Sequence, residues 1–137
     1  MSAGYSGTPL VRKLGFRPGW RVAVLGSVPE HLDDLLGPLP PGLRIQRRLG
    51  DGLDAAWIFV ARRRELERRV PEVLPRLPPD GTLWISWPKR SSGVPTDVTE
   101  NVLREVVLPT GWVDIKVAAV DEIWSGLRFA LRREQRH

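Results

Sequence analysis

The sequence predicts a single α/β domain with a minimal Rossmann-like, mainly parallel sheet, helices on both faces and a C-terminal antiparallel hairpin. Three observations lead to this fold class. A chain of 137 residues suits one domain. Up to residue 108, short apolar runs alternate with helical patterns, an order that builds parallel sheets through right-handed crossovers. Beyond that point apolar and polar residues alternate, which indicates a hairpin.

Six segments have the pattern of strands. They are residues 22–26, 43–49, 55–60, 82–87, 113–119 and 127–131. Residues 55–60 are wholly apolar and give the strongest signal of a buried strand, so we expect Trp57 inside the core, and Trp84 with it. Arginines interrupt residues 43–49, and we place that strand at a sheet edge, where charge discourages aggregation.

Two helices are expected in the first third of the chain. Thr8 has the position of an N-cap before a short helix that ends at Gly15. Ser27 and Glu30 have the spacing of a capping box, which predicts a second helix that ends at Gly37. Each helix would thus be bounded by residues with a known physical role at helix ends.

Two further helices are expected after the strands at 55–60 and 82–87. Pro71 lies inside the first of them and should kink or split it, because proline lacks an amide hydrogen and clashes with the preceding turn. Asp97 and Glu100 form another capping box and should open the second. Residues 1–7 are expected to be an N-terminal arm and residues 133–137 a mobile tail of the single domain 1–137.

Composition narrows the classes of function. There are no cysteines, so disulfides and thiolate chemistry are excluded, and the histidines His31 and His137 show no catalytic or metal-binding pattern. No apolar run is long enough for a membrane span, and we expect a cytoplasmic protein. The formal net charge of +5 is dispersed over helix and strand faces and comes without a nucleic-acid-binding motif.

The candidate ligand site is the loop after the strand at 82–87, because ligands bind at the carboxyl ends of parallel strands. Lys89 follows that strand, and Ser92, Thr96 and Asp97 lie close behind it at the expected start of a helix. Arg62 follows the neighbouring strand. A cation, hydroxyl groups and free backbone amides could converge there on an anion. The alternative is that these residues only form a turn and a helix cap.

The sequence assigns no cofactor, no metal and no catalytic residue. A dinucleotide or S-adenosylmethionine site needs several glycines after the first strand, and only Gly26 is present. A ribose-binding acid is expected about 20 residues later, where Gln46, Arg47 and Arg48 occur instead. We therefore expect neither S-adenosylmethionine nor NAD(P) to bind.

The order of elements resembles the Rossmann-like fold of S-adenosylmethionine-dependent methyltransferases with one strand–helix unit missing. The sequence also resembles an uncharacterised bacterial family of small proteins, a domain of unknown function that opens Tyr-Ser-Gly-Thr-Pro. The residues that carry this resemblance are 5–10, 13–15, 87–89, Ser92, Gly93, Thr96, Asp97, Glu100, 113–117, Asp121 and 124–127. Arg90 departs from it, because a second lysine would be expected there. The resemblance implies a bacterial protein and supplies no activity.

Three hypotheses of function follow. The leading one is a non-catalytic module, on a degenerate methyltransferase-like fold, that binds a small ligand or a protein. The second is a small enzyme that acts on an anionic substrate. The third is a weak nucleic-acid binder. The expected partner is an anionic small molecule or a protein, with no membrane and no specific nucleic acid.

Overall fold

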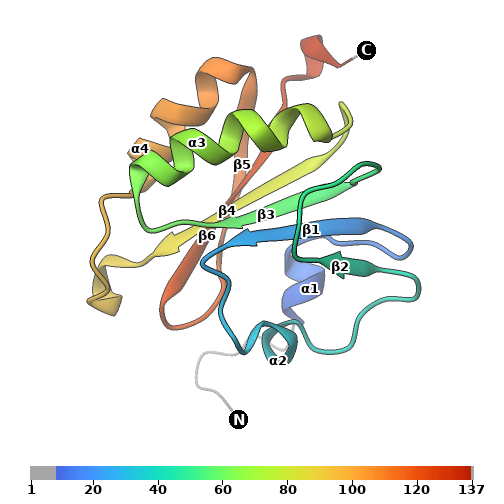
Figure 1. Cartoon of the computed structure of the whole chain (residues 1–137), viewed down its shortest axis with the longest axis horizontal. Coiled ribbons are helices and arrows are strands. Elements are labelled where there is room, and N and C mark those ends of the chain that lie inside the picture. The colour runs from blue at the N-terminus through green and yellow to red at the C-terminus, as the bar shows by residue number, and fades with distance from the viewer. Residues whose placement is uncertain (1–8, 137) are drawn as a thin grey trace.

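The computed structural model describes residues 9–136, which form one six-stranded sheet in the order β2-β1-β3-β4-β6-β5 (Figure 1). The strands are β1 Arg21–Gly26, β2 Arg44–Gln46, β3 Ala55–Phe59, β4 Thr82–Pro88, β5 Trp112–Ala119 and β6 Trp124–Leu131. Strands β1 to β4 pair in parallel, and β6 pairs antiparallel with both β4 and β5. The predicted mainly parallel sheet, the edge position of β2 and the C-terminal hairpin are confirmed.

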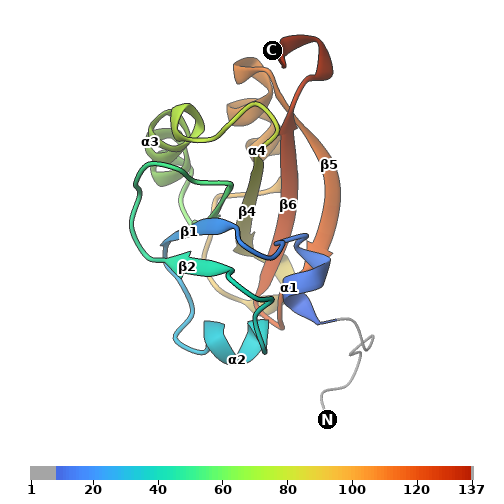
Figure 2. The ribbon, with the colours of Figure 1, turned by 90° about the vertical axis from the view of Figure 1, so that its right-hand side faces the viewer.

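Helices cover both faces of the sheet, as predicted. The α-helices are α1 Leu10–Lys13, α2 Leu32–Leu36, α3 Arg63–Val73 and α4 Glu100–Val107, and the 3-10 turns are Leu74–Arg76, Arg90–Ser92, Leu108–Thr110 and Arg133–Gln135. Helices α3 and α4 lie over one face, and α1 and α2 lie on the other (Figures 1 and 2). None of the helices in residues 9–136 is long and apolar enough to cross a membrane.

Two hydrophobic clusters hold the layers together, one on each side of β3 and β4, whose residues are all buried. Trp57 and Trp84 are fully buried, which confirms their expected place in the core. Each indole is satisfied: Trp57 Nε1 donates to Ser86 Oγ at 2.8 Å, and Trp84 Nε1 donates to the Leu14 carbonyl at 2.7 Å. The second bond ties the segment after α1 to the centre of the sheet.

The expected capping box at Ser27 and Glu30 is wrong. Helix α2 begins only at Leu32, and no side chain caps it. The Ser27 amide donates to the Phe59 carbonyl at 3.0 Å and the Val28 amide to the Gly26 carbonyl at 2.9 Å, so the chain after β1 first makes a turn against β3. The helix that follows has five residues and ends at Gly37, as predicted.

Pro71 does not split its helix. Helix α3 runs through Pro71 to Val73 and then tightens into the 3-10 turn at 74–76. Pro71 is exposed and lies in the last turn of α3, so only Glu72 and Val73 follow it in the helix. A kink at Pro71 stays a prediction. The predicted end of α1 at Gly15 is confirmed, with Gly15 at φ +77°.

The sequence led to a prediction for each end of the chain. Thr8 and the expected arm at 1–7 lie outside the described residues. In the expected tail, residues 133–135 form a 3-10 turn, and Arg136 Nε donates to the Leu131 carbonyl at 2.9 Å. The mobility of this tail stays a prediction.

Candidate functional site

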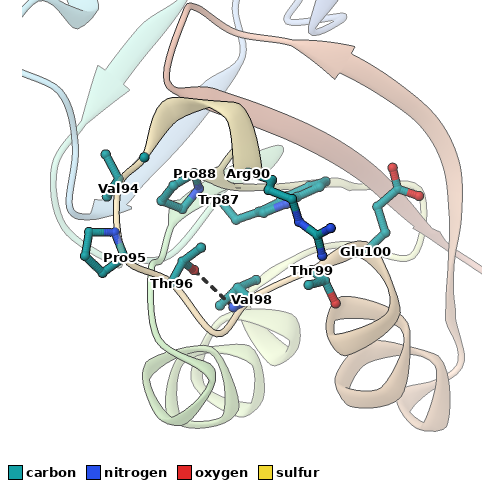
Figure 3. Close-up of a pocket in the computed structure, with 10 residues that line it drawn as sticks. Trp87, Pro88, Arg90, Val94, Pro95, Thr96, Val98, Thr99 and Glu100 are labelled. Atoms are coloured by element: carbon teal, nitrogen blue, oxygen red, sulfur yellow. Dashed lines mark hydrogen bonds between the residues drawn. The ribbon is translucent and has the colours of Figure 1, made fainter.

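A hollow of about 540 Å³ lies at the carboxyl end of β4, between the loop that follows this strand and the start of α4 (Figure 3). The residues that line it are Trp87, Pro88, Arg90, Gly93, Val94, Pro95, Thr96, Val98, Thr99 and Glu100. Trp87 is 7% exposed and Val98 1%, so both belong to the core and make a firm wall. The predicted loop therefore borders a cavity, in the place where parallel sheets bind ligands.

The first half of this loop is held by its own backbone and by the hairpin. The Lys89 amide donates to the Ile123 carbonyl at 2.7 Å, which fixes the end of β4 beside the β5–β6 turn. Ser92 Oγ donates to the Lys89 carbonyl at 2.6 Å and accepts from the Val94 amide at 3.2 Å. Ser92 thus closes the turn that forms the rim of the hollow.

The second half of the loop is anchored to the start of α3. Thr96 Oγ1 donates to the Ala61 carbonyl at 2.7 Å and accepts from the Val98 amide at 3.0 Å. Asp97 Oδ1 accepts from the Arg63 amide at 2.6 Å. Because Arg63 is the first residue of α3, the Asp97 carboxylate satisfies one of the free amides at that helix end.

The expectation that Asp97 caps the helix following it is therefore wrong. Thr99 is the N-cap of α4, and its Oγ1 accepts from the Val102 amide at 3.2 Å. The two acceptors lie close together in the sequence, but Asp97 caps α3 and Thr99 caps α4. The capping-box pattern alone does not distinguish these partners.

The polar groups of the hollow come from Arg90 and the first turn of α4. Arg90 is exposed, and its side chain extends across the hollow towards Thr99, beside the Trp87 ring (Figure 3). Within residues 9–136, no carboxylate lies at ion-pair distance from Arg90. A guanidinium without an acidic partner, beside a firm apolar wall, can bind a small anion through charge-assisted hydrogen bonds.

Glu100 faces the same hollow, and Arg104 binds its carboxylate. Glu100 Oε2 lies 3.2 Å from Arg104 Nη2, and Arg104 Nε lies 3.2 Å from Asp114 Oδ2. Hydrogen bonding by Asp114 is the main cause that raises the pKa of Arg104 above its usual value. This pairing draws the Glu100 charge towards Arg104, which weakens its repulsion of an anion near Arg90.

The structure brings together only part of the site predicted from the sequence. Thr96 lines the hollow, whereas Lys89, Ser92 and Asp97 belong to the same loop but are not among the lining residues. Arg62 is exposed at the start of α3, beside the Asp97 anchor. Ligand binding by these five residues stays a prediction. Trp87, Arg90 and Thr99 line the hollow but are not among the residues predicted from the sequence; Arg90 is the position at which the sequence departs from the family it resembles.

The crevice between β1 and β3 is the topological switch point of the sheet, where a Rossmann-like fold holds a nucleotide. Here the β1–β3 ladder continues past the strands through the Ser27–Phe59 bond. Gly26 has φ +93°, and a Cβ there would lie 2.1 Å from the Phe59 carbonyl oxygen. Glycine at position 26 therefore allows the backbones of β1 and β3 to pack closely. At the end of β2, Gln46 donates to the Arg48 carbonyl at 2.9 Å, and the two residues that follow the strand directly, Arg47 and Arg48, are basic.

Metal ligands do not gather in the part of the chain that the structure describes. No group of three or more His, Asp or Glu side chains there could hold a metal ion. His31 is exposed, and its Nε2 lies 3.2 Å from Asp121 Oδ2. Asp121 in turn accepts from the amides of Ile123 and Trp124, so this pair belongs to the β5–β6 turn.

Comparison with solved structures identifies the fold. The sequence matches no family model and no curated protein. The structure is similar to an S-adenosylmethionine-dependent methyltransferase from Aquifex aeolicus, with a TM-score of 0.62 and 14% identity over 88% of this chain and 86% of that one. It is also similar to Aeropyrum pernix fibrillarin with bound S-adenosyl-L-methionine, with a TM-score of 0.53 and 17% identity over 93% and 70%.

A third similar structure is TrmN from Thermus thermophilus, with a TM-score of 0.55 and 15% identity over 89% of this chain. The chain spans about half the length of TrmN, since it covers 47% of that protein. Identities this low establish architecture and transfer no activity. The chain has an α/β fold of the methyltransferase type, with the mostly parallel sheet and antiparallel C-terminal strands of that class.

Proposed function

We propose that this protein is a non-catalytic module that binds a small anionic ligand in the hollow after β4, on a degenerate methyltransferase-like fold. The observation that carries the proposal is Arg90, an exposed guanidinium without an acidic partner in residues 9–136, set between Trp87 and the first turn of α4. Charge-assisted hydrogen bonds from Arg90 would bind the anion, and the indole would contact its apolar part.

The backbone at the topological switch point, between β1 and β3, supports the proposal that this fold no longer binds a nucleotide cofactor. A bound nucleotide needs backbone amides that are free at the end of β1, but Ser27 donates its amide to Phe59. It also needs an acid after β2 to hold the ribose, and Gln46 ends that strand. With neither feature present, we propose that the ligand site has moved from β1 to the end of β4.

The wider setting of the protein is part of the same proposal. The residues around Trp87 and Asp97 match the pattern of the uncharacterised bacterial family, and we assign the chain to that family as a bacterial, cytoplasmic protein. Its partner would then be an anionic metabolite or a protein that presents a carboxylate or phosphate. These assignments rest on the sequence pattern.

The proposal is tested by ligand binding followed through tryptophan fluorescence and thermal unfolding. A panel of carboxylates, phosphate, sulfate and nucleotides is titrated into the wild type, Arg90→Ala, Lys89→Ala and the matched control Arg47→Ala, which removes an exposed arginine at the far edge of the sheet. Arg90→Ala should weaken binding of the responding anion by about tenfold, the usual effect of losing one charge-assisted bond. Arg47→Ala should change nothing.

Two outcomes would overturn the proposal. Equal binding by the wild type and Arg90→Ala would place the ligand elsewhere. Conversion of a bound anion into product by the wild type would make the protein an enzyme and favour the second hypothesis.

A further inference from the structure

Four basic side chains gather around the end of α1, on the face of the sheet opposite to α3 and α4. They are Lys13, Arg17, Lys116 and Arg128, and we call them the basic cluster. Lys13 ends α1 and Arg17 follows it, whereas Lys116 and Arg128 come from β5 and β6. Figure 2 shows α1 beside these two strands.

The contacts of the four residues place them in one corner. Lys116 and Arg128 are cross-strand partners in the β5–β6 ladder. Lys116 Nζ donates to the Lys13 carbonyl at 3.0 Å, which joins β5 to the end of α1. A Cβ on Gly15 would lie 3.8 Å from Arg128 Nη1, so the guanidinium lies under the turn that leads to Arg17.

The charges of the basic cluster have no acidic partners within residues 9–136. None of the nine ion pairs in that part of the chain includes Lys13, Arg17, Lys116 or Arg128. The opposite face differs sharply. Its paired arginines on α3 and α4 are Arg63, Arg68, Arg69 and Arg104. The four charges of the basic cluster are therefore not neutralised by ion pairs within residues 9–136.

Without a bound ligand, the surroundings of Arg128 are electrostatically unfavourable for its positive charge. Burial, and then repulsion by Arg17, lower the pKa of Arg128 below its usual value. Among residues 9–136, its Nε is buried and has no hydrogen-bond partner, and Nη2 bonds Thr82 Oγ1 at 3.3 Å. A donor that is buried without a partner costs free energy, and a nearby like charge adds to that cost. An anion between Arg17 and Arg128 would relieve the repulsion.

A second hollow, of about 570 Å³, adjoins the basic cluster. Arg12, Gly15 and Arg17 form one side of it, and prolines of the turn at 38–41 form the other. Gly15 contributes to both features, because it lines the hollow and lies next to the Arg128 guanidinium. A ligand could thus rest an apolar part against the prolines while its anionic group meets the arginines.

We propose that the basic cluster binds a phosphate group of a small molecule, with Arg17 and Arg128 as its principal ligands. Two guanidinium groups match the geometry of phosphate oxygens, and the lysines add attraction at longer range. The four charges occupy one corner beside a hollow of small-molecule size, whereas a polynucleotide needs a charged stripe along the surface. This site is independent of the hollow after β4.

The test is calorimetric titration of pyrophosphate and inorganic phosphate, with the Gly15 amide followed by NMR. Arg17→Ala and Arg128→Met should each weaken pyrophosphate binding by about tenfold. Arg64→Ala removes an exposed arginine of α3 on the opposite face and should leave binding unchanged. Arg90→Ala should also retain it, which separates this proposal from the proposed function.

A single-stranded RNA dodecamer is titrated in parallel. Binding of the RNA without any response to pyrophosphate would overturn the small-molecule assignment. Equal pyrophosphate affinity in the wild type, Arg17→Ala and Arg128→Met would overturn the site itself. Perturbation of the Gly15 amide by pyrophosphate, lost in both variants, would support it.

Discussion

Removal of the Asp97 carboxylate should destabilise α3, the helix that precedes it in the chain, rather than α4. Asp97 Oδ1 accepts the Arg63 amide at 2.6 Å across 34 residues of sequence, and this bond closes the loop over the hollow as well as capping the helix. The substitution Asp97→Ala leaves the amide of Arg63 to water. Asp97→Asn keeps an acceptor oxygen and removes only the charge.

The expected size of the effect follows from the exposure of the bond. Loss of a helix cap costs about 0.5–2 kcal/mol, and an exposed cap such as Asp97 should cost about 1 kcal/mol. With an unfolding entropy of about 2.1 cal/mol/K per residue, a chain of 137 residues loses ~3.5 °C in Tm for that change. Asp97→Asn should lose about half as much, because part of the effect is the carboxylate's attraction to the helix dipole.

The assay combines thermal unfolding with hydrogen exchange. Asp80→Ala is the matched control, since Asp80 is an exposed acid in a turn and makes no side-chain hydrogen bond within residues 9–136. In Asp97→Ala the amides of the first turn of α3 should exchange faster, while those of α4 keep their protection. Faster exchange confined to α4, or an unchanged Tm, would refute the assignment of Asp97 to α3.

We expect three other substitutions to change the stability of the protein in a defined direction. Gly26→Ala should cost on the order of 3 kcal/mol in chemical denaturation, because a Cβ would meet the Phe59 carbonyl and φ is positive; a variant as stable as the wild type would contradict the close packing. Ser86→Ala removes the acceptor of the Trp57 indole and should cost about 1–3 kcal/mol, and an unchanged urea midpoint would disprove this role. Arg128→Met should keep or raise the Tm, because burial lowers the pKa of Arg128 and so disfavours its charged form; a lower Tm would count against that reasoning.

The sheet could be predicted because its signals are local and strong. The run 55–60 is apolar throughout and forms β3, buried on both faces. The alternation after residue 112 predicted the hairpin but not the burial of β5, because Ile115 and Val117 are exposed and the register shifts between Asp114 and Lys116. The general rule on right-handed crossovers predicted the parallel pairing, but the full strand order was not predicted from the sequence.

The errors arose where a backbone or side-chain group bonds a partner far along the chain. Ser27 and Glu30 have the spacing of a cap, but the backbone at Ser27 is already bound to Phe59. Asp97 has the spacing of a cap for α4 and instead caps α3. Such partners depend on how β3 lies beside β1 and β4, and a local pattern carries no information about that.

The predicted loop borders a hollow, but of the five predicted ligand-binding residues only Thr96 lines it, and ligand binding there stays a prediction. The rule that ligands bind at the carboxyl ends of parallel strands selects the loop after β4, and the hollow is there. The rule does not say which side chains point inward. Lys89 was preferred for its charge, whereas Arg90, the next residue, lines the hollow.

The central claim is that this methyltransferase-like fold has lost its cofactor site at the end of β1. The most direct test is a titration of the ¹⁵N-labelled protein with S-adenosylmethionine, read at the amides of Gly26 and Ser27. We predict no saturable change at either amide, because the Ser27 amide is bound to Phe59 and Gln46, Arg47 and Arg48 stand at the end of β2 where an acid would hold the ribose. Saturable shifts of Gly26 and Ser27 would contradict the claim and restore a working cofactor site to this fold.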